Sequence, residues 1–502
     1  MPHQRTRRDF LKSATAGMLP LSGAIGAGRA VGAAPATKMR EPVPVQPEIE
    51  RLVRLMEDQP RDRVIPALVR EVRKGLTQRR FLAAALMTAI RNWPVDHSVY
   101  MMHAVHQLSL DLPTEDRLLP LFWSVDSMKH FKWKQKLSRV KSDRYTHPAK
   151  AARVFEAAML ESDRDTAQAA ILSLARSEGP QPAFDRFWRW GAGRCGGSNI
   201  GHAAIAVANA YRTLNAVGWQ HAGPVLQFLT HLGSQKTPSG LMAWPRTPVE
   251  RLRPDWAGGV SRTSTVLGLL ERYRDGNPQE AAKTTHARIA KGELQAASVW
   301  DAILLLASEH VVRHKQGGVT GRPLHSVTMA NALHAAFHSC RKPDDRLYLL
   351  LEAVHWVTKF YDAERRNKRL RDMSIVKIPE VDFPKDESEA VAELFALLPH
   401  HDRFKRVTDR APQDKVAPLA FALARRNATA GFLRAARRYV CRNSSVDAHE
   451  LKFPVAVFEN CRAVSPAWRP HIFASSVHVL HGPRQKENPA VRQARELLAR
   501  RS

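Results

Sequence analysis

Apolar residues recur at helical spacing along most of this chain, and this periodicity limits its fold more than any other feature. In the segment that begins near Glu48, for example, Ile49, Leu52, Val53 and Met56 fall on one helical face. The alternating patterns of half-buried strands are almost absent. We therefore expect an all-α protein. Further helices are expected near 64–72, 81–92, 97–110, 148–160, 165–177, 182–190, 201–217, 222–232, 264–275, 278–291, 296–313, 326–339, 344–366, 388–398, 416–426, 428–441, 447–463, 470–480 and 490–499.

The connections between these helices are mostly short, which is typical of stacked antiparallel helix pairs. Ala-rich faces, such as the one at 203–210, allow close helix approach. Because no fixed period repeats along the chain, the sequence favours an irregular stack. An α-solenoid and a closed helical bundle with a central cavity both fit this pattern.

Proline-containing stretches divide the chain into segments. Residues 48–502 also fit one continuous domain. The expected segments are a signal peptide (1–36), a Pro-rich linker (37–47), an N-terminal helical half (48–233), a Pro-rich loop (234–262), a middle helical segment (263–371), a second loop (372–387) and a C-terminal helical segment (388–502).

The N-terminal segment Thr6–Lys12 reads TRRDFLK and resembles the twin-arginine export signal, with Arg7, Arg8, Phe10 and Leu11 at its defining positions. The resemblance implies recognition by the twin-arginine translocase and a periplasmic or extracellular location. That route carries folded proteins, often with a cofactor already inserted, so it favours a redox or metal protein. The following residues, up to 36, are too rich in Gly and Ala for a membrane helix.

The chain is strongly basic, with 77 Lys and Arg against 48 Asp and Glu and a formal charge of +29. These charges are spread evenly, without the dense block or aromatic pattern of a nucleic-acid site, so no nucleic-acid partner is expected. For an exported protein, acidic polysaccharides or anionic lipids suit such a surface, although a merely solvated basic surface explains it equally. No later run reaches the roughly 18 apolar residues of a membrane span, so no transmembrane anchor is expected.

Several enzyme classes lack their signatures in this sequence. GxSxG, the P-loop, CxxCH and CxxC are all absent, which argues against a serine hydrolase, an NTPase, a c-type cytochrome and a thioredoxin-like protein. The chain contains 22 histidines, and several lie on otherwise apolar helices. Three local groups of residues therefore become candidate sites.

The first group is a glycine-rich loop that leads into a helix at His202. Free backbone N–H groups at such a helix start can hold an anion, and the positive helix end lowers the pKa of a nearby histidine. A flexible turn with a capping residue is the alternative. The expected binding residues of this loop are Gly196, Gly197, Ser198 and Asn199, with His202 as a catalytic residue.

The second group lies on the helix that begins near Pro323. His334 and His338 are four residues apart on one face, a spacing that can hold a metal ion. About one such pair is expected by chance (22 × 22/502), so the spacing alone discriminates little. His325 lies at the start of this helix and is a further candidate catalytic residue, together with His334.

The third group lies at the start of the helix near 447–463. Asp447 and Glu450 fit a capping box, which explains both carboxylates without any catalytic role. A neutral His449 beside a carboxylate is also a competent general base. Lys452 joins the candidate binding residues, and Asp447 is a candidate metal ligand with His334 and His338. His103 and His106 are expected to be packing histidines with a hydrogen-bond partner.

The phrases GHAA at 201–204, NAYR at 209–212, LHSVT at 324–328 and NALH at 331–334 are similar to the questin-oxidase-like family. Those proteins are all-helical and include Baeyer–Villiger-type oxygenases. The resemblance covers well under half of the chain, and it implies an oxidoreductase. An exported location departs from that family's usual setting, because nicotinamide reductants are scarce outside the cytoplasm.

Three hypotheses follow from the sequence. The first is an exported helical oxidoreductase with a cavity lined by His202, His325, His334 and His449, acting on a small organic substrate. Its cofactor, a metal or an organic redox group, is not determined by the sequence. The second is a non-catalytic envelope scaffold or binding protein for acidic glycans, lipids or a protein partner. The third is a metal-dependent hydrolase that uses Asp447, His449 and His334.

Overall fold

Side-chain caps mark the start of four helices in this computed structural model, α9 (Arg164–Ser177), α15 (Pro278–Ala290), α19 (Glu387–Leu397) and α24 (Pro489–Ala499). Asp163, Asn277, Asp386 and Asn488 each accept a hydrogen bond from a backbone N–H in the first turn that follows. The structure describes residues 41–92, 97–110, 112–131, 137–141, 144–196, 199–233, 249–315, 321–379, 381–382, 386–398, 411–478, 480 and 486–500.

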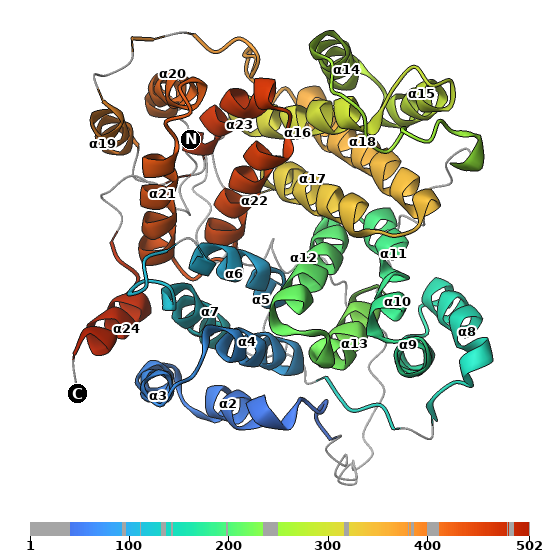
Figure 1. Ribbon diagram of the computed structural model, residues 1–502, viewed down its shortest axis with the longest axis vertical. Helices are drawn as coiled ribbons and strands as arrows, with labels where there is room; N and C mark the ends of the chain where they lie inside the picture. Colours follow the sequence, from blue (N-terminus) through green and yellow to red (C-terminus); the bar gives the residue numbers. More distant parts are fainter. Residues whose placement is uncertain are drawn as a thin grey trace, which may run out of the picture. The chain divides into compact units, whose positions relative to one another are not determined.

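The described part of the chain is helical and contains no β-strand, which confirms the predicted all-α class. Figure 1 shows the arrangement of the helices. They are α2 (Pro47–Asp58), α3 (Arg61–Arg73), α4 (Gln78–Asn92), α5 (His97–Tyr100), α6 (Met102–Leu110), α7 (Leu119–His130), α8 (Pro148–Glu161), α9 (Arg164–Ser177), α10 (Pro180–Phe184), α11 (Phe187–Gly193), α12 (His202–Val217), α13 (Ala222–Gly233), α14 (Thr263–Asp275), α15 (Pro278–Ala290), α16 (Ala296–Arg313), α17 (Arg322–Ser339), α18 (Pro343–Arg366), α19 (Glu387–Leu397), α20 (Ala411–Arg425), α21 (Ala430–Asn443), α22 (His449–Ala463), α23 (Arg469–Ser475) and α24 (Pro489–Ala499), with short 3-10 turns at Trp219–His221, Val249–Arg251, Pro466–Trp468 and Ser476–His478.

One helix, α7, was not predicted by the sequence pattern. Its sequence LPLFWSVDSMKH buries residues on every face, from Leu119 through Met128. A helix that is buried all round has no polar stripe, so its periodicity is invisible in the sequence. The expected helix at 97–110 is divided in the structure, because α5 ends at Tyr100 and α6 begins at Met102.

Four helices that are far apart in the sequence form a ring of neighbours. α6 packs against α12 and α22, and α17 packs against the same two helices. The short helix α5 lies against α4, α6 and α12. Long-range packing of this kind brings residues near 100, 200, 330 and 450 into one region of the protein.

Residues Pro42–Ser502 form one compact unit. Whether its helices stack as antiparallel pairs stays a prediction. Among the described helices, none combines the length and the apolar character needed to cross a bilayer. The cysteines Cys195, Cys340, Cys441 and Cys461 are not joined by disulfides.

A buried carboxylate links three helices on one side of this unit. The Glu309 side chain on α16 is fully buried. It accepts hydrogen bonds from Arg274 Nε of α14 (2.7 Å) and from the Tyr361 hydroxyl of α18 (3.2 Å). The backbone N–H of Ile375 donates a third, at 3.0 Å. Removing this carboxylate leaves cationic and polar groups without their partner in the interior.

We therefore expect Glu309→Ala to lower the free energy of unfolding by about 3–5 kcal/mol, as is usual when one partner of a buried ion pair is removed. Urea unfolding followed by circular dichroism measures this change. The control Glu271→Ala removes an exposed carboxylate from α14, and we expect a change within about 0.5 kcal/mol. Equal losses in the two variants would contradict the importance of the buried network.

Candidate metal centre

Four histidines converge from the first turns of four helices. His97, His202 and His449 are the first residues of α5, α12 and α22, and His325 is the fourth residue of α17. The imidazole centroids lie 4.8 Å apart for His97 and His202 and 4.4 Å apart for His97 and His449. The His325 centroid lies 4.7 Å from that of His202 and 5.4 Å from that of His449. We call these four residues the histidine cluster.

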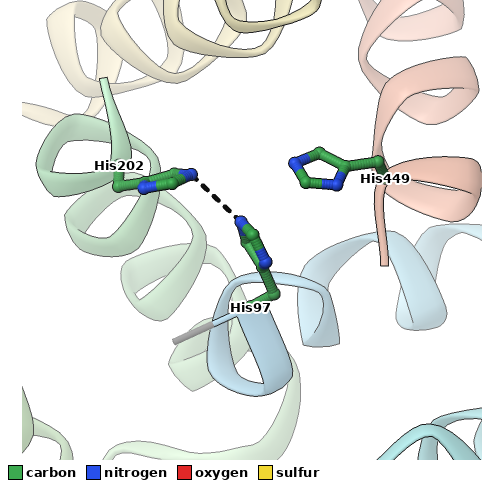
Figure 2. Close-up of side chains that lie close together, drawn as sticks. All are labelled: His97, His202 and His449. Atoms are coloured by element: carbon green, nitrogen blue, oxygen red, sulfur yellow. Dashed lines mark hydrogen bonds between the residues drawn. The ribbon is translucent and has the colours of Figure 1, made fainter. Parts of the chain in front are cut away.

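Three of these residues form a group with metal-binding geometry. One nitrogen from each of His97, His202 and His449 can be chosen so that all three lie within 4.8 Å of one another. Figure 2 shows the three rings approaching a common space from separate helices. Nitrogens bound to one ion at about 2.1 Å each in tetrahedral geometry are about 3.4 Å apart. The most widely separated nitrogens therefore need to approach by up to about 1.4 Å to hold one ion.

The His97 and His202 rings are already close to a ligand arrangement. Their Nε2 atoms are 3.0 Å apart. Two imidazole nitrogens at this separation must share either a proton or a cation, because two lone pairs would repel. Without a metal, one ring donates an N–H and the other accepts it.

The neighbour of His449 determines which of its nitrogens can bind a ligand. His449 Nδ1 lies 2.8 Å from Asp447 Oδ1, and the same oxygen accepts the His449 backbone N–H at 3.0 Å. The carboxylate holds the imidazole proton on Nδ1, so Nε2 is the nitrogen that carries the lone pair. Carboxylate–histidine pairs orient metal ligands in this way in many metalloproteins. Glu450 reaches back to the Ser445 hydroxyl (2.8 Å) instead of completing a capping box with Asp447.

The electrostatic environment keeps three members of the cluster, His97, His202 and His325, neutral. Burial and the positive charge of Lys452 hold the pKa of both His97 and His202 well below the ordinary value. Burial, with smaller effects from His202 and Lys452, does the same for the pKa of His325. Helix starts carry partial positive charge, which acts in the same direction. Neutral imidazole is the form that binds metal ions.

His325 lies beside these three residues, although its nitrogens are not within 4.8 Å of all three ligand nitrogens. Its side chain is almost inaccessible, with 2% of the residue's surface exposed. Its Nδ1 atom has no hydrogen-bond partner among the residues that the structure describes. A buried polar nitrogen without a partner carries a desolvation cost, which binding of a ligand would relieve.

The other site residues predicted from the sequence do not belong to the group of three histidine ligands. His334 and His338 form their own pair, with Nε2 atoms 3.1 Å apart. In the described part of the chain, these two residues are not grouped with Asp447 into a metal site. Lys452 is buried, with Nζ 5.9 Å from the Tyr100 ring centroid. Asn199 Oδ1 accepts the Ala203 N–H (2.9 Å), Gly196 is buried, and Gly197 and Ser198 lie outside the described residues.

Sequence reasoning missed His97 as a site residue. The signal for it was present, because His97 follows Pro94 and begins a predicted helix. His202 follows Gly201 and His325 follows Pro323 in the same manner. Each of these three histidines therefore lies one to three residues after a Gly or a Pro that precedes or begins its helix.

Gly201 sets the entry of α12 and so the placement of His202. Its φ is +91°, a conformation that favours glycine, and an added Cβ would lie 2.9 Å from Met329 Cβ on α17. We expect Gly201→Ala to cost about 1–3 kcal/mol of unfolding free energy, measured by urea denaturation. Gly223→Ala on α13 meets no atom within 4 Å, so this control should be neutral or slightly stabilising. Equal effects of both variants would refute this role of Gly201.

Many buried histidines should make the fold sensitive to acid. Burial is the main cause that lowers the pKa of each of His97, His103, His106, His202, His221, His231, His286, His310, His325, His334, His338, His355 and His471. Below pH 6.5 the unfolded chain binds more protons than the folded one, so stability falls as the pH falls.

We expect the Tm of EDTA-treated protein to drop by roughly 5 °C or more between pH 7.5 and 5.5. Differential scanning calorimetry in matched buffers measures this shift. Most carboxylates titrate below this window, so it isolates the histidines. A Tm that stays constant or rises towards pH 5.5 would mean that these histidines are not held neutral by the fold.

Comparisons with protein-family models, with curated proteins and with solved structures found no match for this chain. The resemblance to the questin-oxidase-like family therefore stays a prediction.

Proposed function

We propose that this protein is a metal-dependent oxidoreductase whose single metal ion is bound by His97, His202 and His449, with His325 as the fourth ligand. The observation that supports this most is the convergence of the three ligand nitrogens within 4.8 Å. Chance explains a pair of histidines at helical spacing, but it does not readily bring histidines from three distant helices together.

The donor set narrows the choice of metal and reaction. Imidazole nitrogens suit iron, copper, nickel and zinc, whereas calcium and magnesium prefer oxygen ligands. Among these ions, iron and copper exchange single electrons readily, which supplies the chemistry for oxidising an organic substrate. Asp447 is engaged by the His449 ring and backbone. It is therefore not placed as the general base that a zinc hydrolase needs beside its metal-bound water.

Export by the twin-arginine route belongs to the same proposal. The TRRDFLK segment supports delivery of a folded protein that already contains its metal, to the periplasm or beyond. An enzyme there would draw its electrons from the substrate or a small reductant rather than from a nicotinamide. We propose a small organic molecule as the substrate, since the cluster lies among buried helix ends.

Metal analysis of purified protein tests the proposal directly. We expect about one iron or copper per chain by inductively coupled plasma mass spectrometry. We expect that His97→Ala and His449→Ala each lower the metal content at least tenfold. The matched control His334→Ala removes a histidine from the separate His334–His338 pair and should retain the metal. The metal should also change oxidation state reversibly with ascorbate and ferricyanide, followed by electron paramagnetic resonance.

Other results would favour the alternatives. Stoichiometric zinc that no reductant alters would contradict the oxidoreductase and favour the metal-dependent hydrolase. Protein without any metal, in its native host and after addition of Fe²⁺, Cu²⁺ or Zn²⁺, would contradict both enzymes. Salt-sensitive binding to an acidic polysaccharide would then favour the envelope binding protein.

A further inference from the structure

A second buried polar group lies further along the same central helices. Arg212 of α12 donates from Nη1 to Glu459 Oε2 of α22 (2.9 Å) and from Nη2 to Asn331 Oδ1 of α17 (3.0 Å). Glu459 Oε1 lies 2.7 Å from His103 Nε2 of α6. Asn331 Nδ2 donates to Asn460 Oδ1 at 3.0 Å. Every helix of the central ring contributes to this group, which we call the arginine clasp.

The clasp holds a charge pair out of water. Arg212 and Glu459 expose only 16% and 21% of their side chains. Burial raises the pKa of Glu459, but His103 and Arg212 outweigh it and hold that pKa below the ordinary value. The carboxylate is therefore ionised and tied to its guanidinium partner. A buried ion pair of this kind is weak evidence for stability but is well suited to fixing register.

The spacing of the clasp matches the spacing of the histidine cluster. His202 and Arg212 are ten residues apart on α12, and His449 and Glu459 are ten residues apart on α22. Ten residues of helix span about 15 Å, and a slip of one residue moves a helix by about 1.5 Å. Such a slip would separate Arg212 from Glu459 and His202 from the other ligands together. Fixing one pair therefore fixes the other.

A second connection joins the two groups. Asn209, whose side-chain oxygen also accepts from Arg212, donates from Nδ2 to the Tyr100 carbonyl at 2.7 Å. Tyr100 is the last residue of α5, which His97 begins, and its ring packs 5.8 Å from that of His97. The clasp thus positions α5 as well as the three longer helices.

We propose that Arg212 and Glu459 are positioning residues for the metal centre, acting through the register of α12 against α22. This inference depends on the proposed metal site at His97, His202 and His449. The hydrogen bonds that form the clasp join Arg212, Glu459, Asn331, Asn460 and His103 to one another, so its effect on the metal would be transmitted through helix position.

Cobalt substitution tests this role. Metal-free full-length protein is titrated with Co²⁺, and the visible ligand-field spectrum and the Kd are recorded for wild type and for Glu459→Gln. We expect the variant to bind Co²⁺ about 10–100-fold more weakly, as for lost supporting contacts in other metal sites. We also expect shifted absorption bands. A stabilising role alone would leave the spectrum unchanged.

The matched control is Asp126→Asn. Arg61 of α3 donates to both carboxylate oxygens of Asp126 on α7, at 2.6 and 2.9 Å. This pair involves neither the cluster nor the clasp, and the change from acid to amide is the same. We expect lower stability in urea but the wild-type Co²⁺ spectrum and Kd.

Two results would overturn the positioning role of Arg212 and Glu459, and a third would contradict the metal centre. A wild-type spectrum and Kd in Glu459→Gln, or equal weakening in Asp126→Asn, would overturn the positioning role. If Glu459→Gln does not fold, Asn331→Ala takes its place, because it removes the hydrogen bonds of Asn331 within the clasp and leaves both charged partners, Arg212 and Glu459, in place. If wild-type protein binds no Co²⁺, the proposed metal centre itself is contradicted. This result is distinguishable from failure of the positioning role alone, in which wild type and Glu459→Gln bind Co²⁺ equally well.

Discussion

Burial of four imidazole rings at helix starts is the constraint on which the centre of this protein depends. An imidazole taken out of water must find a hydrogen-bond partner, a metal ion or a carboxylate. His449 has Asp447, and His97 and His202 have each other. His325 keeps a nitrogen without such a partner in the described part of the chain. His97, His202 and His325 are held neutral, and neutral imidazole is the form in which histidine binds a cation.

The central helices carry two polar groups at different heights along their axes, and each group meets a different physical requirement. The histidine cluster gathers neutral donors at the helix starts, whereas the arginine clasp gathers opposite charges about ten residues further on. Both levels draw on α12, α17 and α22. The hydrogen bonds of the clasp can form in only one alignment of the central helices. They therefore oppose a shift of one helix along another, which Ala-rich apolar contacts alone would not prevent.

Much of the fold could be predicted from the sequence, because a helix with one solvent-exposed face shows a recognisable amphipathic spacing of apolar residues. α12 and α22 were expected within one or two residues of their observed starts. α7 was not expected, because its faces are uniformly buried. For the site, His202, His325 and His449 were expected to line one cavity. His97 was missed, and His334 was grouped with them although it pairs with His338.

The sequence by itself determined the helical class, the positions of most helices and the chemistry available at their starts. These properties depend on neighbours within a few turns, which a linear pattern records. Only the tertiary structure decided that residues 97, 202, 325 and 449 meet, and that Arg212 faces Glu459 across 247 positions. Contacts at such separations depend on how the helices pack around one another. The periodicity of apolar residues shows which face of a helix is buried, but not which other helix that face contacts.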